Sequence, residues 1–236
     1  MRRYDAVMFD LLTALLDSWT LWNSVAGGAE PGLRWRRRYL ELTYGCGAYR
    51  PYETLVAEAA AETGMAPAAA AALATRWGEL QPWPEAPALL AGLHGAGLKL
   101  AVATNCSIPL GRQAAGLVGV PFDAVITSEE AGFYKPRAEV YLAALAALGL
   151  PAERVLFVAG SASDVPGAAG VGMDVVWHNR AGLAPKDDTR PLAMADSLAP
   201  LLAGLNGAPP RKAGPLRGLC PLKLPGQGPR GPWNPG

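Results

Sequence analysis

Polar side chains follow several hydrophobic stretches of this sequence at the points where those stretches end, and together they could carry out covalent catalysis. Asp10 follows the apolar run of residues 6–9, which is typical of a short strand buried on both faces. Comparable positions later in the chain are occupied by Thr104, Asn105, Lys135, Ser161 and Asp164. A carboxylate that a nearby ammonium group keeps ionised can attack an electrophilic carbon or phosphorus and form an ester.

Taken alone, each of these residues has a simpler structural explanation. A single aspartate after a strand, such as Asp10, most often caps the start of a helix. The carboxyl ends of parallel strands meet at one edge of a sheet, however, and ligands of open α/β sheets bind there. We therefore interpret the set as one site, in which the ammonium of Lys135 favours the ionised form of Asp10 and the like charge of Asp164 disfavours it.

The segments that must position these residues alternate between strand and helix patterns. Strands and helices are predicted in turn at residues 98–104, 109–117, 122–127, 138–148, 154–159, 165–170 and 173–177. Repeated strand–helix units with short loops indicate a parallel sheet that is covered on both faces. The predicted fold class is therefore α/β, with a Rossmann-like parallel sheet core that the strand at residues 6–9 joins.

Residues 18–83 show helical patterns only. Ser18 can cap a first helix that ends at Gly27-Gly28, and three further helices are expected at residues 33–42, 52–63 and 67–77. The predicted domains are a core of residues 1–17 and 84–206, an all-helical insertion at 18–83, and a disordered tail rich in proline and glycine at 207–236.

Composition disfavours several other kinds of protein. Half of the 236 residues are hydrophobic and the net charge is +1, which gives no electrostatic basis for binding nucleic acid or an anionic membrane. No segment has the pattern of a membrane span or a signal peptide. Three scattered cysteines and two histidines disfavour a disulfide framework, a zinc site and a Ser-His-Asp triad. We expect a cytoplasmic protein that acts on a small molecule.

Together these motifs resemble the haloacid dehalogenase superfamily and, within it, the L-2-haloacid dehalogenases. The similarity covers residues 4 to about 202. Its motifs include, in chain order, Phe9-Asp10-Leu11, Trp35-Arg36, Thr104-Asn105-Cys106-Ser107, Tyr134-Lys135-Pro136, Leu156-Phe157-Val158 and Asp164. The resemblance implies that the helical insertion is a cap, which closes over a small substrate and excludes water.

The resemblance also implies a role for each residue of the site. Asp10 would attack the carbon that carries the halogen and displace halide, and water oriented by Asp164 would hydrolyse the resulting ester, while Lys135 pairs with Asp10. Substrate and halide would be bound by Arg36, Thr104, Asn105, Tyr141, Ser161, Leu12 and Thr13. No metal or other cofactor is expected, and an apolar helix in the insertion is consistent with a homodimer.

Leu12 favours cleavage of a carbon–halogen bond over hydrolysis of a phosphate ester. Phosphatases of the superfamily usually have a second aspartate two positions after the nucleophile, where it protonates the leaving alcohol, and Leu12 cannot donate a proton. A halide leaving group needs no proton. The predicted activity is therefore the hydrolytic dehalogenation of short 2-haloalkanoic acids to 2-hydroxy acids.

Two alternative functions stay open at this point. One is a magnesium-dependent phosphatase of the same superfamily, in which Asp10 and Asp164 bind the metal; the other is a non-catalytic scaffold or binding protein with the same fold. The chain also departs from the dehalogenase pattern at residues 10–14, which read Asp-Leu-Leu-Thr-Ala in place of Asp-x-Tyr-Gly-Thr, and at residues 159–161, which read Ala-Gly-Ser in place of Ser-Ser-Asn. These differences concern the substrate more than the fold.

Overall fold

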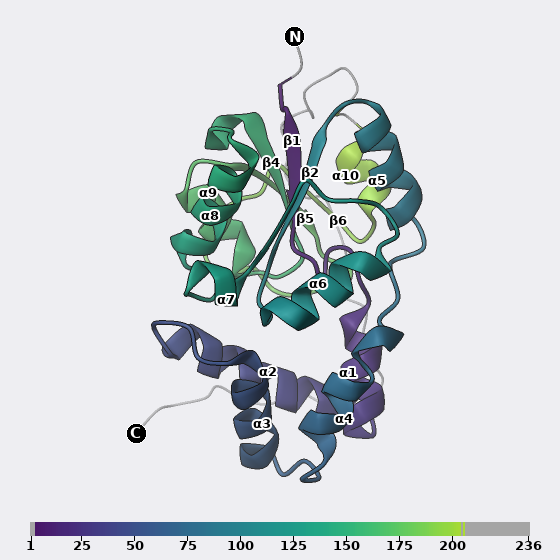
Figure 1. Cartoon of the computed structure of the whole chain (residues 1–236), viewed down its shortest axis with the longest axis vertical. Helices are drawn as coiled ribbons and strands as arrows, with labels where there is room; N and C mark the ends of the chain where they lie inside the picture. The colour runs from purple at the N-terminus through teal and green to yellow at the C-terminus, as the bar shows by residue number, and fades with distance from the viewer. Residues whose placement is uncertain (1–2, 204, 206–236) are drawn as a thin grey trace, which may run out of the picture.

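A six-stranded parallel sheet lies at the centre of the computed structural model, which describes residues 3–203 and residue 205. In chain order the strands are β1 (Ala6–Phe9), β2 (Lys99–Thr104), β3 (Ala124–Thr127), β4 (Val155–Ala159), β5 (Asp174–His178) and β6 (Ala193–Ala195). Their spatial order is β3-β2-β1-β4-β5-β6, so the chain extends the sheet in opposite directions from β1 (Figure 1). The predicted α/β fold with a parallel sheet is confirmed.

The central strand β1 explains why its sequence is continuously apolar. It pairs with β2 on one side and with β4 on the other, where Phe9 aligns with Val158. Val7 and Phe9 belong to the hydrophobic cluster on one face of the sheet, whereas Ala6 and Met8 belong to the cluster on the other face. Because both faces are buried, neither set of alternating side chains can be polar.

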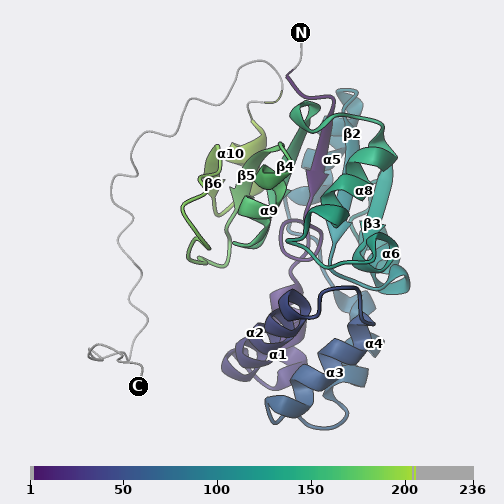
Figure 2. The same cartoon turned by 90° about the vertical axis from the view of Figure 1, so that its left-hand side faces the viewer.

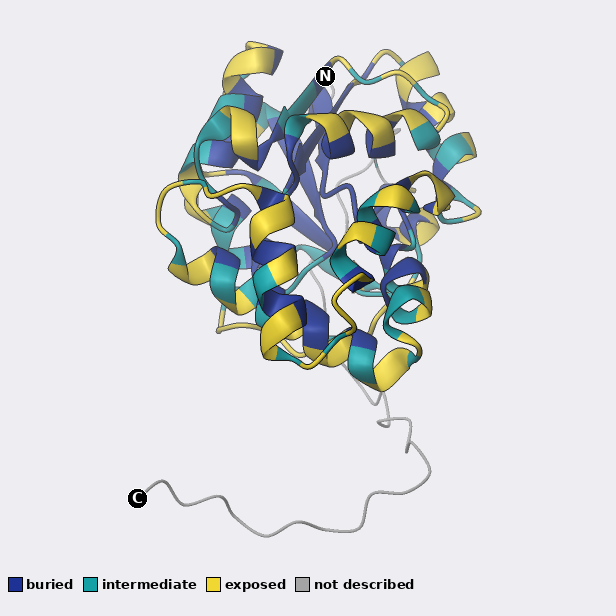
Figure 3. Cartoon of the chain, turned by 60° about the horizontal axis from the view of Figure 1, so that its bottom comes forward, coloured by how far each residue is buried: buried dark blue, intermediate teal, exposed yellow. Residues whose placement is uncertain are grey.

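Helices cover both faces of the sheet (Figures 1 and 2). α5 (Ala86–Gly95), α6 (Ile108–Leu117) and α10 (Leu198–Leu202) pack against one face, and α8 (Ala138–Leu148) and α9 (Asp164–Gly170) pack against the other. Two further short elements belong to the sheet domain, namely α7 (Ser128–Ala131) and the 3₁₀ turn η2 (Ala152–Arg154). Figure 3 shows the buried strands enclosed by helices whose outer surfaces are exposed.

Four helices form a separate unit beyond the carboxyl edge of the sheet (Figure 1). They are α1 (Ser18–Ala26), α2 (Ala29–Gly45), α3 (Tyr52–Glu62) and α4 (Ala69–Thr75), followed by the 3₁₀ turn η1 (Trp77–Glu79). Aromatic rings hold the unit together, with centroids 4.7 Å apart for Trp22 and Trp35 and 5.3 Å apart for Tyr39 and Tyr52. The buried indole N–H of Trp35 donates to the carbonyl of Val56 (2.9 Å), which ties α2 to α3.

Two features of the first helices differ from prediction. The cap of α1 is Asp17, not Ser18, because the Asp17 carboxylate accepts a backbone N–H from the first turn of the helix. α2 begins at Ala29, before the predicted start, and Gly32 lies inside it. A Cβ on Gly32 would lie 2.9 Å from the Cα atom of Asn23 in α1, so this glycine permits close helix packing and does not break the helix.

The last described elements, β6 and α10, were not predicted from the sequence. α10 is only five residues long, and its buried residues Leu198, Leu201 and Leu202 belong to the cluster on the α5 side of the sheet. The predicted disordered tail at residues 207–236 lies outside the described residues. Among the helices that the structure describes, none combines the length and apolar character needed to cross a membrane.

Candidate active site

Asp10 is the first residue after β1, and the turn that follows holds its carboxylate. The backbone N–H of Asp10 donates to the carbonyl of Val158 in β4 (3.0 Å), which fixes the residue at the centre of the sheet edge. Its Oδ2 atom accepts three hydrogen bonds, from the backbone N–H (3.0 Å) and hydroxyl (2.5 Å) of Thr13 and from the backbone N–H of Ala14 (3.2 Å). The residue is 6% exposed, so these donors fix its orientation out of contact with bulk solvent.

Neighbouring elements fix the turn itself. The indole N–H of Trp83 donates to the carbonyl of Thr13 (3.0 Å), and Nδ1 of His178, at the end of β5, lies 2.9 Å from the carbonyl oxygen of Ala14. Gly160, which follows β4, allows the turn to approach, because a Cβ there would lie 2.2 Å from the hydroxyl oxygen of Thr13. The Thr13 hydroxyl therefore occupies space that a larger residue at position 160 would fill.

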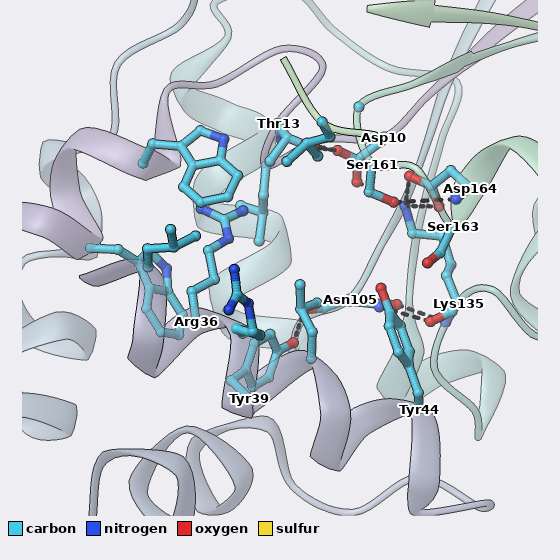
Figure 4. Close-up of a pocket in the computed structure, with 18 of the residues that line it drawn as sticks. Asp10, Thr13, Arg36, Tyr39, Tyr44, Asn105, Lys135, Ser161, Ser163 and Asp164 are labelled. Carbon is cyan, nitrogen blue, oxygen red and sulfur yellow. Dashed lines mark hydrogen bonds and ion pairs between the residues drawn. The ribbon is translucent and has the colours of Figure 1, made fainter. Parts of the chain in front are cut away.

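Lys135 joins Asp10 to a second carboxylate (Figure 4). Its Nζ atom lies 2.8 Å from Oδ1 of Asp10 and 3.1 Å from Oδ1 of Asp164, and all three residues are buried. Asn105, which follows β2, accepts the backbone N–H of Lys135 (2.8 Å) and donates to its carbonyl (3.1 Å). The hydroxyl of Tyr141 in α8 donates to Oδ1 of Asp164 (2.8 Å). Residues from two strand ends, from the loop before α8 and from helices α8 and α9 thus form one hydrogen-bonded network.

The pKa values of the two carboxylates shift in opposite directions. Burial would raise both, but for Asp10 the charge of Lys135 and the hydrogen bonds from Lys135 and Thr13 outweigh burial and place the pKa below its ordinary value. For Asp164, burial and the charge of Asp10 outweigh the attraction of Lys135 and raise the pKa. Burial would lower the pKa of Lys135, but the two carboxylates raise it. Asp10 therefore suits a nucleophile and Asp164 a base.

A cavity of about 210 Å³ lies between this network and the helical unit. On the side of α1 and α2 its lining is mainly aromatic and aliphatic and consists of Trp19, Trp22, Leu33, Arg36, Arg37, Tyr39, Leu40 and Tyr44. Arg36 is 8% exposed, and the central carbon of its guanidinium lies 3.9 Å from the centroid of the Trp19 ring. It also donates to the hydroxyl of Ser18 (2.9 Å). Stacking and hydrogen bonding hold this cation at the cavity wall.

The structure brings most of the predicted site residues together at this cavity. Its lining includes Asp10, Leu12, Thr13, Arg36, Asn105, Lys135, Ser161 and Asp164. Tyr141 is not part of the lining and acts on the site through its hydrogen bond to Asp164. Thr104 is fully buried behind the lining, with its hydroxyl oxygen 3.6 Å from the sulfur of Cys106. Burial raises the pKa of Cys106 to about 12, so its thiol stays protonated.

Sequence reasoning missed much of the lining contributed by α2. Arg37, Tyr39, Leu40 and Tyr44 line the cavity, and the hydroxyl of Tyr39 also donates to the carbonyl of Asn105 (3.2 Å). The available signal is the spacing of residues 33, 36, 37, 40 and 44, because positions three and four residues apart share one face of a helix.

Asp10 and Asp164 are the groups in this site that could hold a metal ion, and the donor set does not fit one. Oxygens of both carboxylates already face the ammonium of Lys135, and Leu12 adds no side-chain oxygen. Within residues 3–203 and 205, no three His, Cys, Asp or Glu side chains gather closely enough to bind a metal.

Comparison with known proteins agrees with this geometry. The model of the haloacid dehalogenase-like hydrolase family matches residues 14–172. Haloacetate dehalogenase H-2 of Moraxella sp. (strain B) is 28% identical over 200 residues, which cover 78% of this chain and 89% of that protein. (S)-2-haloacid dehalogenase H-109 of Pseudomonas putida is 30% identical over 199 residues, which cover 77% of this chain and 88% of that protein.

A solved structure shows the same arrangement of elements. The L-2-haloacid dehalogenase of Xanthobacter autotrophicus, with chloropropionic acid covalently bound, has a TM-score of 0.73 and 25% identity to this chain, and the match covers 86% of this chain and 99% of that one. The family model spans more than half of the chain, and the Pseudomonas putida relative is similar over three quarters of it. The chain belongs to the haloacid dehalogenase-like hydrolases.

Proposed function

We propose that this protein hydrolyses the carbon–halogen bond of short 2-haloalkanoic acids and forms 2-hydroxy acids through an ester on Asp10. The observation that carries this proposal is the unequal environment of the two oxygens of Asp10. Oδ2 accepts three hydrogen bonds from Thr13 and Ala14, whereas Oδ1 accepts only from Lys135 among the described residues. Oδ1 is therefore the oxygen that can form a new bond.

In the first step, Oδ1 of Asp10 attacks the carbon that bears the halogen. The O–C bond forms as the C–X bond breaks, and the halide leaves with the bonding electron pair, so no proton is transferred. Arg36, whose positive charge stays at the cavity wall, stabilises the departing halide. Leu12 also lines the cavity and supplies no acid for the leaving group, which matches a leaving group that needs none.

In the second step, water attacks the carboxyl carbon of the ester. Oδ2 of Asp10 is then the carbonyl oxygen, and the donors on Thr13 and Ala14 stabilise the negative charge that develops on it. Asp164 accepts the proton of the attacking water, in keeping with its raised pKa. The bond from the carboxyl carbon to Oδ1 breaks, and Oδ1 takes the proton from Asp164 and leaves as the hydroxyl of the 2-hydroxy acid. The oxygen of water remains in Asp10, and the second proton of that water passes to solvent.

The names of the relatives support this choice of substrate. The proteins compared above are named haloacetate dehalogenase and (S)-2-haloacid dehalogenase, and the solved structure holds chloropropionic acid covalently. We propose the same class of substrate for this chain, acted on without a metal. The magnesium-dependent phosphatase is the less favoured function, because the donor set around Asp10 and Asp164 does not fit a metal ion.

The test is a single turnover of excess enzyme with 2-chloropropionate in ¹⁸O-labelled water, with a chelator present. We expect chloride release and a gain of one ¹⁸O atom in the peptide that contains Asp10, with unlabelled product. Asp10→Asn is the matched control, because it keeps the shape of the side chain and removes the nucleophile; it should release no chloride. Label in the product and not in the peptide would contradict the ester mechanism. Turnover of a phosphate ester that requires magnesium would favour the phosphatase.

A further inference from the structure

Four arginines lie close together on α2, and the structure divides them into two pairs. Arg34 and Arg38 are paired with glutamates: Arg34 lies 3.3 Å from Glu30, and Arg38 lies 3.0 Å from Glu41. Arg38 also bonds to a glutamate of α3. Arg36 and Arg37 have no carboxylate partner among the described residues, and both line the cavity beside Asp10. The sequence singles out Arg36 by resemblance and does not distinguish the other three arginines.

The two unpaired arginines differ in how they are held. Arg36 is buried, stacks on Trp19 and donates to Ser18. Arg37 is exposed and has neither a hydrogen bond nor an ion pair with any residue that the structure describes. It also borders a shallow surface groove that includes Arg34 and Arg38, so it lies at the mouth of the cavity. A guanidinium in this position keeps all of its donors available for an incoming anion.

The charges of the cavity lining indicate which kind of anion Arg37 can bind. With both carboxylates ionised, as the first step requires of Asp10 and the second of Asp164, Lys135 and Arg36 balance their two negative charges. Arg37 is the fifth charged residue of the lining, and it gives the lining a net charge of one positive unit. That excess equals the charge of one monocarboxylate. Without Arg37, a bound carboxylate would give the cavity a net negative charge.

We propose that Arg37 binds the carboxylate of the substrate at the mouth of the cavity, while Arg36 receives the halide deeper in the wall. This inference rests on the proposed function and divides two tasks between adjacent residues of one helix. A planar guanidinium can bind both oxygens of a carboxylate at once. Leu33 and Leu40 lie near Arg37 on the helix, line the cavity and place apolar surface beside that pair. The substrate class is accordingly the free 2-haloacid, because esters, amides and haloalkanes carry no charge for Arg37.

The first test uses Arg37→Gln, with Arg34→Gln as the matched control on the same helix. For Arg37→Gln we expect KM for the substrate 2-bromopropionate to rise about 10- to 100-fold, with kcat within about threefold of the wild type. The inhibition constant of bromide should not change, because Arg36 still receives the halide. Arg34→Gln should change none of these values. An unchanged KM, or a bromide inhibition constant that rises as much as KM, would overturn the inference.

The second test does not depend on turnover. Trp19 and Trp22 line the cavity, so binding of lactate, the 2-hydroxy acid product, can be followed by tryptophan fluorescence. We expect the Kd of lactate to rise in Arg37→Gln by about the same factor as KM and to stay unchanged in Arg34→Gln. If the wild type releases no bromide but lactate binding still depends on Arg37, the proposed function fails and this inference stands. If lactate binds equally to both variants, or does not bind to the wild type, the inference fails.

Discussion

The two sides of the cavity differ in how deeply their charged groups are buried and in how many fixed partners those groups have. On the sheet side, Asp10, Lys135 and Asp164 are all buried, and each accepts or donates hydrogen bonds to fixed neighbours. On the side of α2, large aromatic and aliphatic groups surround two cations, of which Arg37 has no partner among the described residues and is exposed. The contrast separates two requirements of an enzyme. Groups that react need one fixed geometry, whereas groups that bind an incoming substrate need hydrogen-bond donors without other partners.

The sheet side should be the more sensitive to substitution, and Lys135→Met tests this most strongly. The change leaves the buried carboxylates of Asp10 and Asp164 without a counter-charge, so the free energy of unfolding should fall by about 3–5 kcal/mol. The pKa of Asp10 should also rise, because the charge and hydrogen bond of Lys135 no longer offset burial, and single-turnover halide release should fall by about a hundredfold or more. Urea unfolding and rapid-quench kinetics measure the two effects.

Lys186→Met is the control for that experiment, because Lys186 is exposed on a loop of the same chain. It should change the free energy of unfolding by less than about 0.5 kcal/mol. A loss below about 1 kcal/mol in Lys135→Met would show that the network is not under the electrostatic constraint described here.

Substitution on the α2 side should affect recognition more than stability. Arg36→Lys keeps the charge but loses the planar stack on Trp19 and the fixed bond to Ser18. We expect kcat/KM for 2-bromopropionate to fall about 10- to 100-fold and bromide inhibition to weaken, while the free energy of unfolding changes by about 1 kcal/mol or less. Arg34→Lys, at an exposed ion pair, should leave the kinetics unchanged. Equal losses in both variants would contradict a specific role for Arg36.

The two carboxylates of the sheet side should be separable by pH. Because the pKa of Asp10 is lowered and that of Asp164 is raised, falling pH protonates Asp164 first. Ester formation should therefore persist at a pH where ester hydrolysis has slowed, and the ester should accumulate as the pH approaches about 4, the ordinary pKa of an aspartate. Acid quench and intact-protein mass spectrometry detect it. If both steps slow together, the two pKa values are not separated.

The smallest expected effect is that of Tyr44→Phe, which removes one hydroxyl from the α2 side of the cavity. Tyr44 is 40% exposed and lines the cavity, so its hydroxyl takes part only in hydrogen bonding. We expect kcat/KM to change by about threefold or less and the free energy of unfolding by about 0.5 kcal/mol or less. Steady-state kinetics and urea unfolding measure both. A loss of a hundredfold in kcat/KM would move Tyr44 into the reacting part of the site.

The sequence predicts the sheet side better than the α2 side. The bounds of β1 and α8 agree with prediction, because a continuously apolar strand and a helix closed by Gly149 have strong local signals. The positions of Asp10, Lys135 and Asp164 at strand ends or in the connecting loops follow from the parallel sheet. By contrast, the resemblance singles out Arg36, but nothing in the sequence distinguishes Arg37 from Arg34 and Arg38, because only the packing of α2 against α1 and α3 decides which arginines meet glutamates.

The close approach of the turn at residues 10–14 to Gly160 limits which residues this sequence can accept at position 160. A Cβ at position 160 would lie 2.2 Å from the hydroxyl oxygen of Thr13, 2.4 Å from the backbone nitrogen of Ala14 and 2.6 Å from Oδ2 of Asp10, so the turn constrains position 160 although the two lie far apart in the chain. Loss of the Thr13 hydroxyl would not make room for a side chain at 160, because the backbone of Ala14 and the carboxylate of Asp10 would still occupy that space, so glycine is required as long as the turn keeps this shape. Transfer of the residue 10–14 motif into a related enzyme therefore needs the glycine as well.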